Sequence, residues 1–105
     1  MHMIRHFVHL RFRQDVKTTK KHELFERLNN LVTLLEDAID FQYRQNVSFE
    51  INLVRGFDDM FWIDFVDADA LNLYLMDEEH NAIGTEIVEC LVGKAEGVFV
   101  CDINL

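Results

Sequence analysis

The first apolar stretch of the chain, residues 3–12, alternates with the two-residue period of a β-strand. Ile4, His6, Val8, Leu10 and Phe12 then share one face, and four of these five side chains are large and apolar. A histidine on such a face is expected to be buried, and neutral imidazole has one donor and one acceptor to satisfy. Leaving either of them unpaired costs about 1–3 kcal/mol. We therefore expect His6 to meet a protein group, a ligand or a trapped water.

The rest of the chain continues in patterns typical of strands and helices. The first strand is expected over about 3–13, and a helix follows from 18 or 19 to 37 with its apolar positions at helical spacing. A weaker strand is expected over about 41–48, then a polar loop to the turn at 55–59 and a strand over 60–66. Asp67 and Asp77 are typical N-caps for a short helix over 70–76 and a helix that begins at 78. Gly93 or Gly97 stops that helix, and the last strand is expected over 97–103.

The order β-α-β-β-α-β predicts an α+β, ferredoxin-like fold in a single domain over residues 1–105. In this fold two helices cover one face of a four-stranded antiparallel sheet. We expect the first and third strands to lie side by side and parallel in the sheet centre. His6, Asp59 at the start of the third strand, Tyr74 and His80 would then line one end of the space between sheet and helices.

The uncovered face of the sheet is predicted to be an interface. Phe7 on the first strand and Met60 and Trp62 on the third lie among charged residues, whereas a face that meets only water is mostly polar. We therefore expect a homodimer that packs sheet against sheet. The alternative is a monomer with a few exposed aromatic residues.

The composition of the chain makes some classes of binding partner unfavourable. The chain has 10 Lys and Arg against 19 Asp and Glu, a net charge of −9, which disfavours nucleic acid and anionic membranes. We find neither a membrane-spanning apolar run nor a secretory signal pattern. Cys90 and Cys101 are expected to be reduced core thiols in a cytoplasmic protein. The sequence has no phosphate-cradling glycine loop or dinucleotide fingerprint, so no cofactor is expected.

The four polar candidates suit proton-transfer chemistry on a small apolar or carbonyl-bearing molecule. Imidazole titrates near neutral pH and can act as base or acid, and a phenol or second imidazole can steady an enolate oxygen. In the competing interpretation His6 bonds a backbone carbonyl or His80, and the protein is a structural dimer without turnover. A third interpretation is a metal site built from His6, Asp59 and His80, although no metal-binding motif is complete.

Several segments together resemble the stress-responsive dimeric α/β-barrel family, called Dabb. They are MIRHFVHLRF, the QNVS segment at 45–48, RGFDDMFWIDFVDADALNLYL at 55–75, EEHNAI at 78–83 and FVCDI at 99–103. They span nearly the whole chain in the right order. The resemblance implies a ferredoxin-like fold and two subunits joined through their sheets into a barrel.

Within that family the chain is more specifically similar to plant polyketide cyclases, which deprotonate a linear polyketide thioester and assist its ring closure. The resemblance matches their pocket histidine on the first strand to His6, their helix-start histidine to His80 and a pocket tyrosine to Tyr74. The chain departs from them at three places. Asp59 and Leu28 stand where those enzymes have a further histidine and a further tyrosine, and DEEH replaces the common H-P-x-H form. A cyclase with the same substrate is therefore not expected.

Overall fold

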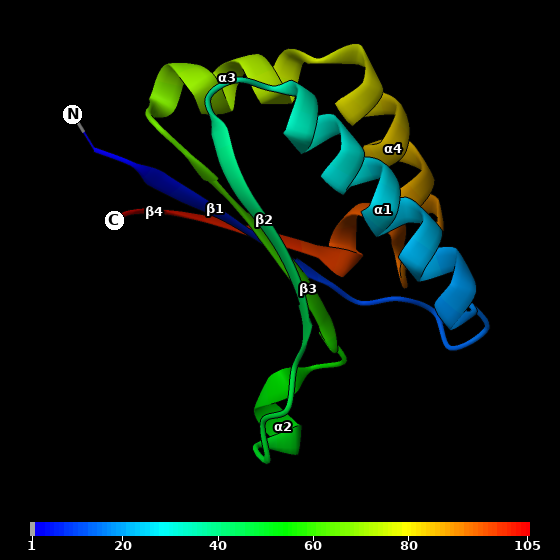
Figure 1. Cartoon of the computed structure of the whole chain (residues 1–105). Coiled ribbons are helices and arrows are strands. Elements are labelled where there is room, and N and C mark those ends of the chain that lie inside the picture. The colour runs from blue at the N-terminus through cyan, green and yellow to red at the C-terminus, as the bar shows by residue number, and fades with distance from the viewer. Residues whose placement is uncertain (1) are drawn as a thin grey trace.

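The computed structural model describes residues 2–105, so Met1 of the domain expected over 1–105 lies outside the described residues. The elements are β1 (Ile4–Leu10), α1 (Thr18–Leu34), β2 (Ala38–Gln45), α2 (Ile51–Val54), β3 (Asp59–Phe65), α3 (Ala68–Met76), α4 (Glu78–Glu89), a 3₁₀ turn (Lys94–Gly97) and β4 (Val98–Asn104). Helices α1, α3 and α4 lie on one side of the sheet, and β1 begins at the same end of the molecule where β4 ends (Figure 1). The ferredoxin-like fold class is confirmed.

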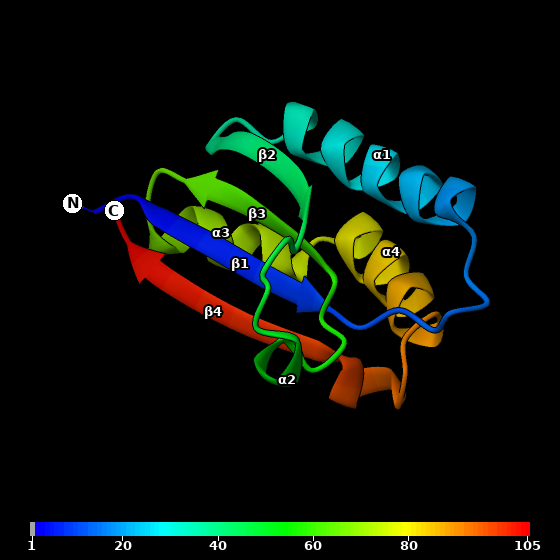
Figure 2. The same ribbon diagram turned by 90° about the horizontal axis from the view of Figure 1, so that it is seen from below.

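The four strands lie in the order β2-β3-β1-β4, and every neighbouring pair is antiparallel (Figure 2). The expectation that the first and third strands run parallel is therefore wrong. The crossover through α1 leaves β1 and β2 running the same way, with β3 inserted between them in the opposite direction. His6 pairs with Ile63 and Asp102, whereas Leu10 pairs with Asp59. The start of β3 thus lies at the far end of β1 from His6.

The core lies between the sheet and its three helices. Burial follows the predicted parity of β1, because His6, Val8 and Leu10 are buried while the residues between them are only half-buried. The helix face contributes Leu24, Phe25, Leu28, Leu31 and Val32 from α1 and Ile83 and Ile87 from α4. Helix α1 ends at Leu34, short of the predicted 37, because Leu35 already has an extended backbone.

Both predicted N-caps are confirmed. Asp67 accepts a hydrogen bond from the backbone amide of Ala70 at 2.9 Å and starts α3. Asp77 accepts from the amides of Glu79 and His80 at 2.8 and 3.1 Å and starts α4. The side chain of Asp77 therefore fixes the first turn of the helix that carries His80.

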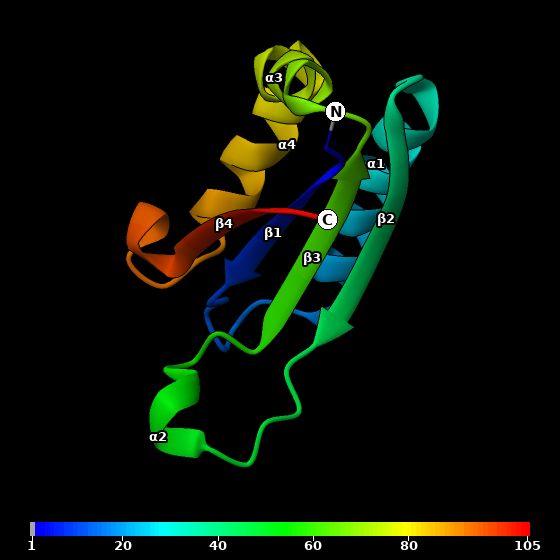
Figure 3. The ribbon, with the colours of Figure 1, turned by 90° about the vertical axis from the view of Figure 1, so that its left-hand side faces the viewer.

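The connection from β2 to β3 differs from the prediction. Strand β2 begins earlier than expected and ends at Gln45, and the loop that follows contains α2 and extends beyond the sheet (Figure 3). We call residues 46–57 the apolar arm, because Val47, Phe49, Ile51 and Leu53 are 85%, 97%, 74% and 64% exposed. The polar loop predicted here is thus an apolar projection.

Two further expectations concern the cysteines and the membrane. Cys90 and Cys101 are both free thiols. Cys90 is half-buried and packs against the core, as predicted, whereas Cys101 pairs with Phe7 on the uncovered face of the sheet and is not a core thiol. Within residues 2–105, the helices fall short of the length and apolarity that crossing a bilayer requires.

Candidate functional site

His6 is buried, as its place in the apolar strand predicts, and its partner is a carboxylate on the neighbouring strand. Only 4% of the residue is exposed, and its Nδ1 lies 2.6 Å from Oδ1 of Asp102. The side chain of Asp102 is 41% exposed on the edge strand β4. A carboxylate accepts hydrogen bonds, so Nδ1 carries the proton and donates it to Asp102. In the neutral imidazole this leaves Nε2 as the nitrogen with a free lone pair, the arrangement that a general base requires.

Tyr74 and His80 lie beside this pair. The ring of Tyr74 is 4.2 Å from that of His80 and 6.1 Å from that of His6, between centroids. Tyr74 is completely buried, and neither its hydroxyl oxygen nor Nδ1 of His80 has a hydrogen-bond partner among residues 2–105. Buried polar atoms without partners are uncommon in proteins and call for a reason. Burial lowers the pKa of His80 and raises that of Tyr74, so both side chains are neutral at physiological pH.

A cleft of about 270 Å³ lies between α4 and β4, next to this group. His6, His80 and Asp102 form its polar part, while Gly84 lies one helical turn beyond His80. The remaining lining is apolar and comes mainly from Val8, Leu10, Phe61, Ile87, Val88, Val98 and Val100. Tyr74 lies behind His80 and instead lines a separate cavity of about 180 Å³ together with Phe65 and Ala70. The cleft therefore has one polar end and is otherwise mostly apolar.

Asp59 does not belong to this group, which corrects the prediction. Its side chain does point to the helix side, but at the opposite end of β1, because β3 runs antiparallel to β1. It is 1% exposed and accepts hydrogen bonds from the hydroxyl of Tyr43 at 2.7 Å and from Nζ of Lys21 at 3.0 Å. Burial raises the pKa of Tyr43, and the carboxylate of Asp59 adds to this effect. Asp59 thus belongs to a satisfied buried network.

The metal interpretation fails for the same reason. His6, Asp59 and His80 are not brought together, because Asp59 pairs with the far end of β1. Within residues 2–105 no group of three or more His, Cys, Asp or Glu side chains is placed to hold a metal ion.

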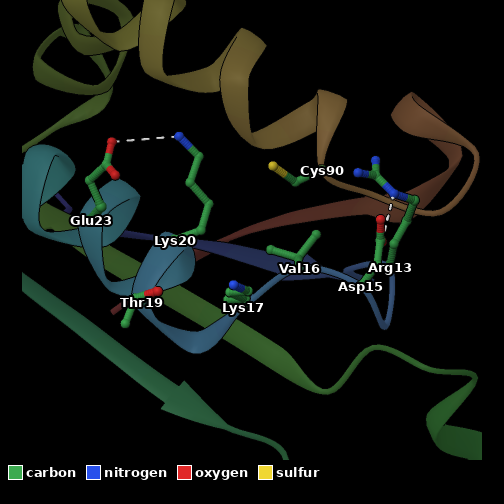
Figure 4. A pocket seen from close by; sticks show the side chains of 8 residues that line it. All are labelled: Arg13, Asp15, Val16, Lys17, Thr19, Lys20, Glu23 and Cys90. Atoms are coloured by element: carbon green, nitrogen blue, oxygen red, sulfur yellow. Dashed lines mark hydrogen bonds and ion pairs between the residues drawn. The ribbon is translucent and has the colours of Figure 1, made fainter.

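A larger hollow of about 470 Å³ lies at the start of α1 and contains none of the predicted site residues (Figure 4). Two of its three basic side chains already have acidic partners. Arg13 pairs with Asp15 at 3.0 Å, and Lys20 pairs with Glu23 at 3.5 Å. The cleft beside His6 therefore remains the better candidate for chemistry.

Asp102 is the site residue that the sequence analysis missed. Its parity with Val98 and Val100 places it on the helix side of β4, and this signal can be read from the sequence. The pairing of Asp102 with His6 depends on the register between the two ends of the chain, 96 residues apart. Local patterns do not specify such a register.

Comparisons with solved structures place this geometry among known proteins. A dimeric ferredoxin-like protein of unknown function from Jannaschia sp. has 24% identity and a TM-score of 0.89, with 98% of this chain and 99% of that chain covered. Protein At3g17210 of Arabidopsis thaliana has 28% identity and a TM-score of 0.82, over 95% and 92% of the two chains. A hydroxynitrile lyase from Passiflora edulis shares the fold with 11% identity and a TM-score of 0.83, over 99% and 94% of the chains.

The remaining comparisons concern curated proteins and families. No curated protein matches the chain. The family described as "Stress responsive A/B Barrel Domain", or Dabb, matches residues 4–105. The chain therefore belongs to the Dabb family of stress-responsive A/B barrel domains.

Proposed function

We propose that this Dabb protein binds a small carbonyl-bearing apolar molecule in the cleft between α4 and β4 and moves a proton on it. The observation that carries the proposal is the 2.6 Å contact between His6 and Asp102 at the polar end of an apolar cleft. The carboxylate holds the imidazole in one tautomer, as in other histidine–carboxylate pairs that act as general bases. The Passiflora edulis protein of the same fold, a hydroxynitrile lyase by name, is consistent with catalysis on this scaffold.

The proposed step is removal of a proton from the carbon next to the carbonyl group. Nε2 of His6 takes the proton, and the electron pair of the broken C–H bond moves into an enolate whose charge rests on the carbonyl oxygen. The negative charge of Asp102 stabilises the resulting imidazolium. Neutral His80 has one N–H group to donate to that oxygen, and a neutral imidazole is suited to this role. Tyr74 holds the ring of His80 by direct contact.

The size of the cleft limits the ligand. A closed apolar cavity of about 150 Å³ accepts benzene. The cleft beside His6 has about 270 Å³, enough for an aromatic ring with a short carbonyl-bearing chain. A suitable probe is therefore 4-phenyl-2-butanone.

The proposal is tested by deuterium exchange. In D₂O, NMR should show that the wild-type protein incorporates deuterium next to the carbonyl of 4-phenyl-2-butanone faster than buffer does. His6→Gln should abolish the acceleration. Asp102→Asn should reduce it at least tenfold, because an amide no longer holds the imidazole proton on Nδ1. His22→Gln is the matched control, because His22 is exposed on α1. Exchange at the buffer rate with the wild-type protein would favour the structural dimer without turnover.

We also propose that two copies pair through the uncovered face of the sheet. Phe7 and Trp62 contact each other there with ring centroids 5.4 Å apart, and Met60 lies on the same face. The register adds Phe99 and Ile103 of β4 to this face, and they are 57% and 41% exposed. The description of the Jannaschia protein as dimeric supports self-association.

A further inference from the structure

We propose that Gly84 is a specificity-determining residue, whose missing side chain makes room beside His80 for the group on the far side of the ligand's carbonyl. This inference rests on the proposed function, because it takes the carbonyl to lie between His6 and His80. Beyond that function, Gly84 would determine the size of the substituent that the protein accepts on the far side of the carbonyl.

The other glycines have structural reasons that Gly84 lacks. Gly56 and Gly93 have positive φ angles of 78° and 70°, a region that other residues rarely adopt. A Cβ on Gly97 would lie 2.7 Å from the backbone oxygen of Val92. Gly84 lies inside α4 and has no positive φ, and a Cβ built on it meets no atom of residues 2–105 within 4 Å beyond its chain neighbours and its own helix backbone. Glycine inside a helix is unfavourable relative to alanine, so the fold alone gives no reason for this choice.

The position of Gly84 places the open space above it next to His80 in the cleft. Residues four apart lie on the same face of a helix, so Gly84 follows His80 along the face of α4 that lines the cleft. Side chains on a helix lean toward its N-terminus. A side chain at position 84 would therefore extend toward His80 and occupy the space next to the carbonyl.

A second hollow adjoins the cleft along α4. A surface hollow of about 440 Å³ on the outer side of α4 shares His80, Gly84 and Val88 with the cleft. Gly84 therefore lies where the two meet. A substituent that is too large for the cleft can pass over Gly84 into this hollow, and a larger residue at position 84 would block that route.

The test compares two ketones that share a phenethyl group and differ across the carbonyl. These are 4-phenyl-2-butanone, with a methyl group, and 4,4-dimethyl-1-phenyl-3-pentanone, with a tert-butyl group. Binding is measured by calorimetry with wild-type protein, Gly84→Ala and Gly84→Leu. Ala82→Leu is the matched control, because it adds bulk to the same helix at an exposed position. Gly84→Ala keeps the test decisive if the leucine variant does not fold.

Wild-type protein and Ala82→Leu should bind both ketones with similar affinity. Gly84→Leu should lose at least tenfold in affinity for the tert-butyl ketone and less than threefold for the methyl ketone, with Gly84→Ala between. Equal losses for both ketones, wild-type affinity in Gly84→Leu, or no binding by the wild-type protein would each overturn the inference. Absent binding would defeat the proposed function as well, whereas the expected selectivity without His6-dependent deuterium exchange would overturn the proton transfer and leave the role of Gly84 standing.

Discussion

Both tyrosines lie on the helix side of the sheet, where Tyr43 is half-buried and Tyr74 is completely buried. Tyr43 donates its hydroxyl proton to Asp59. Burial raises the pKa of each above the ordinary value of 10.0 because it disfavours the charged phenolate. The chain has two tyrosines, so these two residues account for all of its phenol titration.

We therefore predict that tyrosine ionisation accompanies unfolding at alkaline pH. A raised pKa in the folded state gives stability that is fully present below pH 10 and is lost as pH rises above it, because the unfolded tyrosines ionise there. Near-ultraviolet absorbance of tyrosinate should appear together with the loss of far-ultraviolet circular dichroism. Tyr43→Phe and Tyr74→Phe should each halve the absorbance change. A full titration near pH 10 with native circular dichroism would contradict the prediction.

Among elements, α4 links helix capping to the candidate site. Asp77 caps this helix by accepting from the amide of His80, and its negative charge partly offsets the lowering of the pKa of His80 by burial. We predict that Asp77→Ala costs about 1 kcal/mol of stability, the usual value of an N-cap, and lowers the pKa of His80 further. Urea unfolding and NMR titration of His80 measure the two effects.

The matched variant is Asp67→Ala, which removes the corresponding cap of α3. Its loss of stability should be similar, since each carboxylate caps one helix. The pKa of His80 should not change, because Asp67 is not among the groups that shift it. An equal shift in both variants would mean that general loosening of the helices, rather than the charge of Asp77, sets this pKa.

The elements also show how far the sequence can be interpreted. The parity of β1 correctly predicted the burial of His6, and the helical period correctly placed His80 on the face of α4 that lines the cleft, because the side on which a residue lies depends on local geometry. Asp59 was placed at the wrong end because the direction of β3 depends on how distant strands pair. The apolar arm could not be predicted from patterns of burial, because its side chains are not buried in the single chain.

At the scale of the whole molecule, two properties oppose each other in self-association. The uncovered sheet face presents aromatic and aliphatic side chains whose burial would favour pairing. Each chain has a net charge of −9, so pairing brings like charges together. On that face Arg5 bonds Asp64 at 2.8 Å, and Arg5 and Arg44 lie 5.7 and 5.8 Å from the Trp62 ring. These cations limit the repulsion at the centre of the face.

Trp62 is therefore the residue at which replacing an apolar side chain by a charged one should weaken the dimer most. We predict that wild-type protein sediments as a dimer at micromolar concentration, and that added salt tightens the dimer by screening the net charge. Trp62→Glu should sediment as a monomer, because it removes a large aromatic side chain from the face and would bury a carboxylate between two sheets, a cost that the neighbouring Arg5 and Arg44 offset only in part. Leu34→Glu, at an exposed position on the helix side, should stay dimeric. A dimeric Trp62→Glu variant would assign the interface to another surface, such as the apolar arm.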